Sequence, residues 1–232
     1  MPTFPALVGT LAQALSGYSA HVLDIAEPAP GFLDIEFRAS PPTGGWQPGH
    51  EIQIMVTSTQ ARRYTAYRVT GHDRLCILAA LDADGPGTAW VRRLSRGKDV
   101  TLVATKHRPL RLPPAPRLIL GDGSALGTID ACARGVPSSI VALETAPSSV
   151  AALRERWPDY QFLPARTEPG TATQAWLEEA VADGRLDGIL GALLLGHAGS
   201  LQQQRRMLVG HGLLDRRAVT TKPYWATGRA GL

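Results

Sequence analysis

The pattern of hydrophobic and polar positions changes character near the middle of the chain. Before residue 106, six segments alternate apolar and polar positions or are rich in β-branched residues: HVLDIAE, GFLDIEFRA, EIQIMVTS, RRYTAYRVT, RLCILAAL and DVTLVAT. Turn-forming connectors such as PAPG and SPPTGGWQPG separate them. One helix is predicted over residues 85–94, where Trp90, Val91 and Leu94 follow helical spacing. The pattern predicts a six-stranded antiparallel β-barrel.

Beyond residue 106, strands alternate with helices. Near-continuous apolar runs predict strands at RLILG, SSIVALE, YQFLPA and GILGALLLG, and helices are predicted over 126–134, 150–157, 173–182 and 201–209. Such strands are typical of a parallel sheet covered on both faces. The proline-rich and basic KHRPLRLPPAP predicts a linker between the two patterns. We therefore expect a β-barrel domain at 1–106 and an α/β domain at 107–232.

Composition and cysteine spacing restrict the class of protein. Hydrophobic residues make up 44% of the chain and charged residues 19%, which is enough apolar surface for a sizeable core. The sequence predicts no membrane helix and no signal peptide, so a cytoplasmic protein is expected. Cys76 and Cys132 lie too far apart for a C-x-x-C motif or a zinc ribbon, and reduced thiols are expected.

Positive charge is concentrated at the C-terminal end. Residues 199–232 hold six basic residues against one acid, a local charge of +5, although the whole chain carries only +4. This excess suggests an anionic partner such as cofactor phosphates, an acidic chelate or nucleic acid. A solvated helix face explains the charge equally well.

Three segments carry candidate chemistry. In RRYT, Arg62 and Tyr64 share one face of a strand, where a guanidinium binds phosphate and a phenol ring offers a stacking surface. Gly85-Pro86-Gly87-Thr88 opens the predicted barrel helix and brings free N–H groups to its positive end. LGDGSALG follows the first α/β strand with glycines spaced one residue wider than the dinucleotide fingerprint. A tight strand-to-helix connection or a methyltransferase cofactor loop fits this last segment as well.

The order of these segments resembles that of the ferredoxin-reductase-like flavoproteins. Within them the chain most resembles the siderophore-interacting proteins, which are FAD-dependent ferric-siderophore reductases. The resemblance covers nearly the whole chain through WQPGHEIQI, RRYTAYR, DGPGTAWVRRLSRGKDV, LGDGSALGTIDA, LLLGHAG and KPYWATGRAGL. It implies a flavin-binding barrel followed by an NAD(P)H-binding α/β domain.

The resemblance also implies residue roles. Arg62 would hold the FAD phosphates, Tyr64 would stack on the isoalloxazine, and Thr65 would hydrogen-bond near the reactive flavin nitrogen. Gly87 and Thr88 would bind the pyrophosphate, and Gly85 would also contact the cofactor. Gly121, Asp122 and Ser124 would face the nicotinamide nucleotide, and Tyr224 and Trp225 would lie near the flavin. Lys222 and Arg68 would bind the substrate. Basic residues around the opening would attract an anionic ferric chelate.

The chain departs from the family pattern at several positions. Tyr67 replaces the last arginine of R-x-Y-T-x-R, and Arg68 follows on the other face of the strand. Leu81-Asp82 replaces a His-Gly pair, and Gly196-His197 replaces a Gly-Glu pair. GDGSALG stands where the family has G-D-E-T-A-L-P. These departures leave FAD binding best supported and affect pyridine-nucleotide use and the electron acceptor most.

Two further residues end strands of the α/β domain. Glu144 ends the second strand, where an acid accepts ribose hydroxyls. No arginine follows it within nine residues to bind a 2′-phosphate, which slightly favours NADH over NADPH. His197 follows the last long strand, and a structural role is favoured because no second ligand lies at metal spacing. Trp157, Tyr160 and Trp176 are expected in the core. No Ser–His–Asp set and no catalytic acid–base residue is predicted.

The sequence thus predicts a cytoplasmic, monomeric oxidoreductase that uses FAD and NADPH or NADH to reduce a ferric siderophore and release iron(II). Binding to nucleic acid or a membrane is not expected. A flavin reductase or oxidoreductase with another electron acceptor is one alternative. A flavin- or siderophore-binding protein without turnover is another. A methyltransferase would leave the barrel and the R-x-Y-T strand unexplained.

Overall fold

The computed structural model describes residues 17–103 and 109–229, and these form two compact units. Among the described residues, unit 1 comprises 17–28, 32–103, 109–110 and 130–132, and unit 2 comprises 29–31, 111–129 and 133–229. The domain boundary that the sequence places between residues 106 and 107 lies outside the described residues. Each unit is described by itself.

Unit 1 is an antiparallel sheet of seven strands. In chain order they are β1 (Gly17–Ala29), β2 (Phe32–Ala39), β3 (Glu51–Met55), β4 (Ala61–Thr65), β5 (Arg68–Gly71), β6 (Arg74–Ala80) and β7 (Asp99–Val103). Their order in the sheet is β4-β3-β7-β1-β2-β6-β5. The antiparallel barrel class is confirmed, but the prediction of six strands is wrong by one.

The additional strand arises because RRYTAYRVT forms two strands rather than one. β4 pairs with β3, whereas β5 pairs with β6. At the break, the Ala66 N–H donates to the His50 carbonyl and the Tyr67 N–H donates to the Cys76 carbonyl, both at 2.9 Å. The chain therefore passes from one edge of the sheet to the other, which closes the barrel. Because the break interrupts no apolar run, the hydrophobic pattern does not reveal it.

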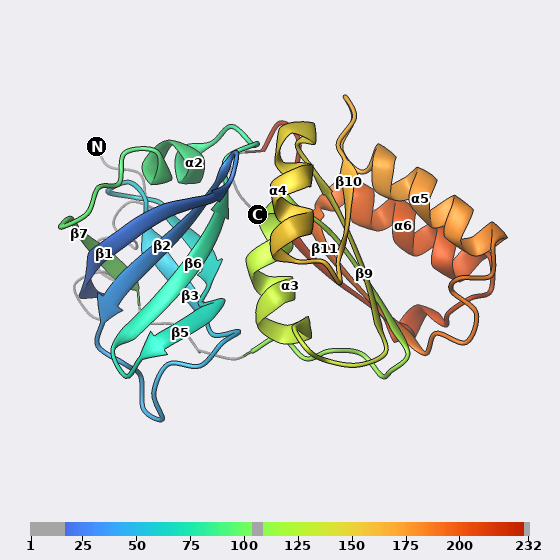
Figure 1. Cartoon of the computed structure of the whole chain (residues 1–232), viewed down its shortest axis with the longest axis horizontal. Coiled ribbons are helices and arrows are strands. Elements are labelled where there is room, and N and C mark those ends of the chain that lie inside the picture. Colours follow the sequence, from blue (N-terminus) through green and yellow to red (C-terminus); the bar gives the residue numbers. More distant parts are fainter. Residues whose placement is uncertain (1–16, 104–108, 230–232) are drawn as a thin grey trace. The chain divides into compact units, whose positions relative to one another are not determined.

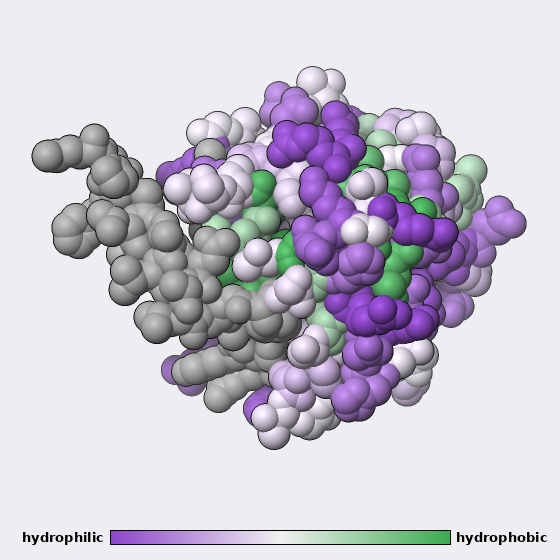
Figure 2. All heavy atoms as spheres, turned by 90° about the vertical axis from the view of Figure 1, so that its left-hand side faces the viewer, coloured by the Kyte–Doolittle hydropathy of each residue, from purple (hydrophilic) through white to green (hydrophobic). Residues whose placement is uncertain are grey.

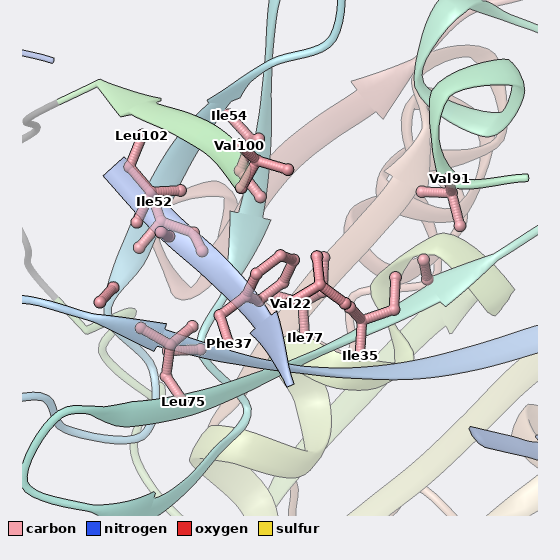
Figure 3. Packing of buried hydrophobic residues seen from close by; sticks show 14 of the residues in the cluster. Val22, Ile35, Phe37, Ile52, Ile54, Leu75, Ile77, Val91, Val100 and Leu102 are labelled. Carbon is pink, nitrogen blue, oxygen red and sulfur yellow. The ribbon is translucent and has the colours of Figure 1, made fainter. Parts of the chain in front are cut away.

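The barrel interior is filled from alternate positions of its strands. Ile35 and Phe37 of β2, Ile52 and Ile54 of β3, and Leu75 of β6 are at most 1% exposed and belong to one cluster (Figure 3). Side chains two residues apart on a strand share a face, so each strand contributes a short apolar row. On the face of the molecule in Figure 2, polar residues cover much of the described surface and surround smaller apolar areas.

The only helix among the described residues of unit 1 is α2 (Pro86–Val91), which is shorter than predicted. Pro86 suits the first turn because a proline lacks only an N–H that the helix leaves unpaired. Trp90 and Val91 bury the last turn in the barrel core. Tighter bonds from Arg93 N–H to the Trp90 carbonyl and from Leu94 N–H to the Val91 carbonyl end the helix.

Unit 2 is a parallel sheet of five strands with helices on both faces (Figure 1). The strands are β8 (Arg117–Asp122), β9 (Ser139–Thr145), β10 (Gln161–Pro164), β11 (Gly191–His197) and β12 (Val219–Trp225), in the order β10-β9-β8-β11-β12. The α-helices are α3 (Leu126–Ala133), α4 (Val150–Arg156), α5 (Thr171–Ala182) and α6 (Ala198–Gly210). The 3-10 turns are η1 (Gly123–Ala125), η2 (Pro147–Ser149) and η3 (Arg216–Ala218).

The doubly covered parallel sheet is confirmed, with β12 as a strand that the sequence did not predict. β12 is an edge strand whose residues are mostly exposed or half-buried, so it lacks the apolar run of the others. In Figure 1, α3 and α4 lie on one face of the sheet and α5 and α6 on the other. Trp157, Tyr160 and Trp176 are buried, as predicted. None of the described helices is long and apolar enough to span a bilayer.

Candidate functional sites

The first candidate site combines β4 with the start of α2 in unit 1. Arg62 and Tyr64 lie opposite Ile54 and Ile52 of β3, so both side chains take the face that the core residues use. Tyr64 packs against the core cluster, and its ring lies 6.0 Å from that of Trp90. Burial raises the pKa of the Tyr64 phenol, which is therefore neutral at physiological pH.

Gly87 brings the second predicted flavin segment against this strand. A Cβ atom added to Gly87 would lie 3.2 Å from the Tyr64 hydroxyl oxygen and 3.4 Å from Arg62 Cγ. The structure thus brings Arg62, Tyr64 and Gly87 together, and the missing side chain of the glycine allows α2 to approach β4 this closely. Thr65 ends β4, Gly85 precedes α2, and Thr88 lies in its first turn. This cradle fits an anionic, flat cofactor such as FAD.

The adjacent arginine of β4, Arg63, has different surroundings from Arg62. Arg63 lies opposite Gln53, and its side chain is exposed on the other face of β4. Its Nε atom lies 3.5 Å from Glu51 Oε1. Adjacent arginines of β4 therefore have different surroundings, and only Arg62 faces the cradle.

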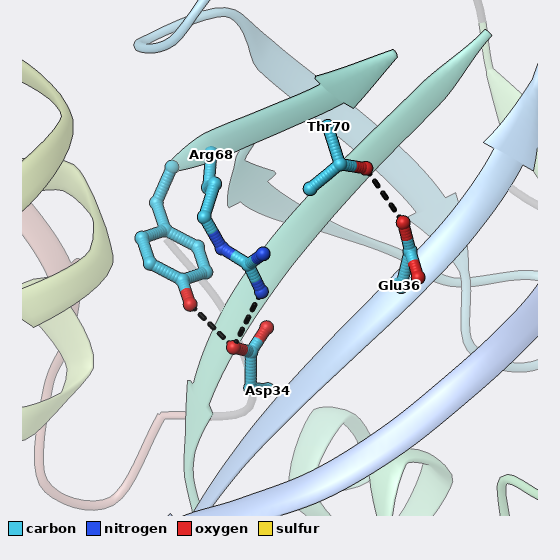
Figure 4. Close-up of polar contacts among 5 residues, drawn as sticks. Asp34, Glu36, Arg68 and Thr70 are labelled. Carbon is cyan, nitrogen blue, oxygen red and sulfur yellow. Dashed lines mark hydrogen bonds and ion pairs between the residues drawn. The ribbon is translucent and has the colours of Figure 1, made fainter.

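A buried carboxylate fixes the chain just beyond this strand. The Tyr67 hydroxyl donates to Asp34 Oδ2 at 2.5 Å, and Arg68 Nη2 donates to the same oxygen at 2.8 Å (Figure 4). Asp34 lies on β2, so these bonds reach across β6 to the start of β5. Burial, together with the hydrogen bond to Asp34, raises the pKa of Tyr67 to about 12. The guanidinium of Arg68 thus forms an ion pair with Asp34 of the barrel. The substrate-binding role of Arg68 stays a prediction.

Tyr67→Phe is expected to lower the free energy of unfolding by about 1–2 kcal/mol, because the buried Asp34 carboxylate loses a donor while the ring volume is kept. Urea unfolding followed by circular dichroism measures the loss. Thr70→Val is the matched control, since it removes an exposed hydrogen bond, from the Thr70 hydroxyl on β5 to the Glu36 carboxylate on β2 (Figure 4). Equal losses in the two variants would contradict the role assigned to Tyr67.

The second candidate site is the carboxyl edge of the sheet in unit 2. Asp122 lies at the end of β8, beside Glu144 in the register of β9. His197 and Trp225 lie side by side at the ends of β11 and β12. Ligands of open α/β sheets bind at this edge. The parallel topology therefore gathers these four residues where a nucleotide would be expected.

Asp122 joins three strands at this edge. Its Oδ1 accepts the Ser124 N–H at 3.0 Å and also the Ser124 hydroxyl. Its Oδ2 accepts the His197 N–H at 2.8 Å and Trp225 Nε1–H at 2.9 Å. Both oxygens are thus engaged within unit 2. The nicotinamide-facing role of Gly121, Asp122 and Ser124 stays a prediction.

Gly121 and Gly196 are the residues that let this arrangement form. A Cβ on Gly121 would lie 2.9 Å from Ile129 Cδ1, so the glycine allows α3 to pack closely on β8. Gly196 has φ +118°, and a Cβ there would lie 2.2 Å from Asp122 Oδ2. Only glycine meets both the backbone and the space requirement at position 196.

His197 is a structural residue, as the sequence favoured. It caps α6, with Nδ1 2.9 Å from Ser200 Oγ and 3.3 Å from the Ser200 nitrogen. With Nδ1 as the acceptor, the neutral ring carries its proton on Nε2, which lies 3.2 Å from Thr227 Oγ1 and donates to it, and the ring centroid lies 4.5 Å from that of Trp225. Burial lowers the pKa of the imidazole, although the charge of Glu144 opposes this shift. The neutral ring keeps the acceptor that capping requires.

Glu144 corrects a prediction. It is only 6% exposed, and its carboxylate accepts the N–H groups of Gly170, Ala172 and Thr173 at 2.9–3.1 Å. Glu144 thus caps the N-terminus of α5, and the expected ribose contact is wrong. The slight preference for NADH then rests only on the absence of an arginine within the nine residues after Glu144, and it stays a prediction. No local sequence pattern indicates this cap, because its partners lie 26–29 residues away.

Glu144→Gln is expected to lower the free energy of unfolding by about 1.5–3 kcal/mol, because a neutral amide replaces the buried charge that accepts three backbone N–H groups. Chemical denaturation at neutral pH measures this change. Glu178→Gln is the matched control, since Glu178 is exposed on the same helix. A Glu144→Gln variant as stable as this control would contradict the capping role.

The basic C-terminal residues divide between the two edges of the sheet. Lys222 lies in β12, with its ammonium 5.7 Å from the ring centroid of Tyr224. Arg205 and Arg206 lie about 12 Å along α6 from its start at the carboxyl edge. Arg216 and Arg217 lie in η3, just before Val219, which pairs with Ala192 at the start of β11. These four arginines therefore lie away from the carboxyl ends of the strands, and the attraction of an anionic chelate by the basic end stays a prediction.

Solved structures match the fold, whereas no protein-family model and no curated protein matches the sequence. A siderophore-interacting protein from Acinetobacter baumannii has a TM-score of 0.74 at 14% identity, with 91% of each chain covered. One from Aeromonas hydrophila has a TM-score of 0.69 at 20% identity, covering 92% of this chain and 93% of its own. Phthalate dioxygenase reductase has a TM-score of 0.67 at 17% identity, covering 94% of this chain and 71% of its own.

These similarities establish the fold, a barrel and an α/β unit of the ferredoxin-reductase-like type. They confirm the resemblance at the level of structure, with siderophore-interacting proteins among the matches.

Proposed function

We propose that this chain is an FAD-dependent oxidoreductase that takes electrons from NAD(P)H and reduces a ferric siderophore, releasing iron(II). The observation that carries the proposal is the cradle of Arg62, Tyr64 and Gly87 in unit 1. The chain shares its fold with siderophore-interacting proteins and with phthalate dioxygenase reductase, which is described as transferring electrons from pyridine nucleotides.

Each residue of the cradle has a distinct part. The Arg62 guanidinium would neutralise and orient the cofactor phosphates. Tyr64, held against Trp90, would present a flat surface to the isoalloxazine, and Gly87 leaves the backbone of α2 accessible to the pyrophosphate. Bound FAD supplies the exchange between a two-electron donor and a one-electron acceptor.

The electron balance is simple. One NAD(P)H provides two electrons as a hydride, so two ferric chelates are reduced for each donor oxidised and one proton is released. Iron(II) leaves because hard oxygen ligands hold it less tightly than iron(III). No acid–base side chain is needed at the metal.

An anaerobic titration tests the proposal. The FAD-loaded protein is mixed with NADPH or NADH, its visible spectrum is recorded, and a ferric hydroxamate or catecholate is then added with a ferrous-specific chelator. The expected result is bleaching of the flavin band by one donor, followed by recovery of the band and formation of the ferrous complex. A protein that does not retain FAD would overturn the proposal.

One observation favours a second candidate, a flavin-binding protein that receives its electrons from a partner. The carboxylates of Asp122 and Glu144 at the carboxyl edge are both engaged by their own unit. In that case the flavin spectrum would be present and neither NADPH nor NADH would bleach it.

A further inference from the structure

Four arginines lie on two segments of unit 2 that contact each other, the second half of α6 and the η3 turn that precedes β12. These are Arg205 and Arg206 of α6 and Arg216 and Arg217 of η3, here called the arginine face. Arg205 Nη2 donates to the Arg216 carbonyl at 3.3 Å, which holds the two segments together. Within residues 17–103 and 109–229, none of the four forms a salt bridge.

An exposed leucine lies beside the arginine face. Leu190 is 55% exposed and is the one large hydrophobic residue that the described part of the chain leaves exposed. It directly precedes β11, and a Cβ on the next residue, Gly191, would lie 3.3 Å from the Ala218 carbonyl oxygen of η3. The backbone next to Leu190 therefore lies close to the η3 turn that carries Arg216 and Arg217.

The arginine face keeps a positive charge after the exposed acids next to it in the chain are counted. Asp215 directly precedes η3 and Asp187 lies three residues before Leu190, so four arginines against two aspartates leave a net charge of +2. Asp183 is matched by Arg185 at 3.4 Å. Guanidinium groups bind phosphate in a bidentate manner, and an exposed leucine enters the boundary between headgroups and acyl chains. No Phe, Tyr or Trp lies in the arginine face to stack a nucleobase, which disfavours nucleic acid.

We propose that the arginine face, with Leu190, docks the protein on an anionic lipid bilayer. The association is peripheral and rests on phosphate-binding arginines supported by one inserting side chain. It replaces the earlier expectation of no membrane partner, and it does not depend on the proposed reductase function.

Vesicle co-sedimentation tests this proposal. The full chain is mixed with vesicles of equal parts phosphatidylcholine and phosphatidylglycerol, or of phosphatidylcholine alone, at low and high salt. We expect binding only to the anionic vesicles, with loss at high salt because surface charges are screened. Each basic residue near such a surface contributes about fivefold to partitioning, so Arg216→Gln with Arg217→Gln is expected to weaken binding by about 25-fold.

Matched variants separate docking from general effects of charge or folding. Arg156→Gln with Arg166→Gln removes two exposed arginines elsewhere in unit 2 and is expected to change binding less than threefold. Leu190→Ser keeps the charge and is expected to weaken binding several-fold. Circular dichroism confirms that every variant is folded.

Three outcomes would overturn the proposal. They are equal binding to neutral vesicles, equal losses in the two double variants, or preferential binding of a short DNA duplex that displaces the vesicles. The last result would assign the arginine face to nucleic acid instead.

Discussion

Arg62→Gln is expected to raise the dissociation constant for FAD by roughly 30-fold to 100-fold. Hydrogen bonds to charged groups contribute about 2–3 kcal/mol, and glutamine keeps much of the side-chain length while removing the charge and the forked donors. Arg62 is the arginine of β4 that faces the cradle of Tyr64 and Gly87. Titration of the apoprotein with FAD, followed by flavin fluorescence, measures the change.

Arg63→Gln provides the matched control for this prediction. The two arginines are adjacent, but Arg63 projects to the other face of β4 and lies near Glu51. Its replacement is expected to alter FAD affinity less than about threefold. If both variants bound FAD equally well, the cofactor would lie elsewhere and the assignment of the cradle would be wrong.

Gly196→Ala is expected to lower the free energy of unfolding by roughly 3 kcal/mol or more. Alanine is strained at φ +118°, and its Cβ would overlap Asp122 Oδ2. The carboxylate would have to move, and it would then lose the His197 N–H and Trp225 Nε1–H donors. Urea unfolding measures the destabilisation, and near-ultraviolet circular dichroism reports the surroundings of Trp225.

Gly188→Ala distinguishes the two causes of this effect. Gly188 also has a positive φ, +76°, but an added Cβ would meet no atom within 4 Å. Backbone strain alone is expected to cost about 1–2 kcal/mol there. If the two variants were equally destabilised, the contact with Asp122 would contribute nothing.

Much of the fold follows from the hydrophobic pattern because most strands bury an apolar row. The apolar runs through Leu118 and Leu194 predict central parallel strands, and Ile35 with Phe37 predicts a barrel strand. The hydrophobic pattern does not predict β12, because this strand lies at the sheet edge and buries little beyond Val219. It does not predict the break at Ala66 either, because the chain changes hydrogen-bonding partners there without ending an apolar run.

The candidate sites were predictable where the chemistry is local and not where it depends on distant partners. The spacing of Arg62 and Tyr64 on one strand predicts a shared face, and the register with β3 agrees. Glu144 and Asp122 show the limit of such reasoning. Their carboxylates are bound by groups 26–29 and 75–103 residues away, and only the folded topology brings these groups together.

With FAD in the proposed cradle, the passage of the chain from β4 to β5 would couple cofactor binding to local opening of the barrel. The strand that presents Arg62 and Tyr64 is also the piece that closes the sheet through Ala66 and Tyr67. A ligand that binds only the closed form suppresses opening by mass action. Amide hydrogen exchange in residues 61–71 should therefore slow when FAD is added, while exchange in the β2–β6 pair should change little. Bound FAD would then stabilise the closed barrel at the segment that joins its two sheet edges.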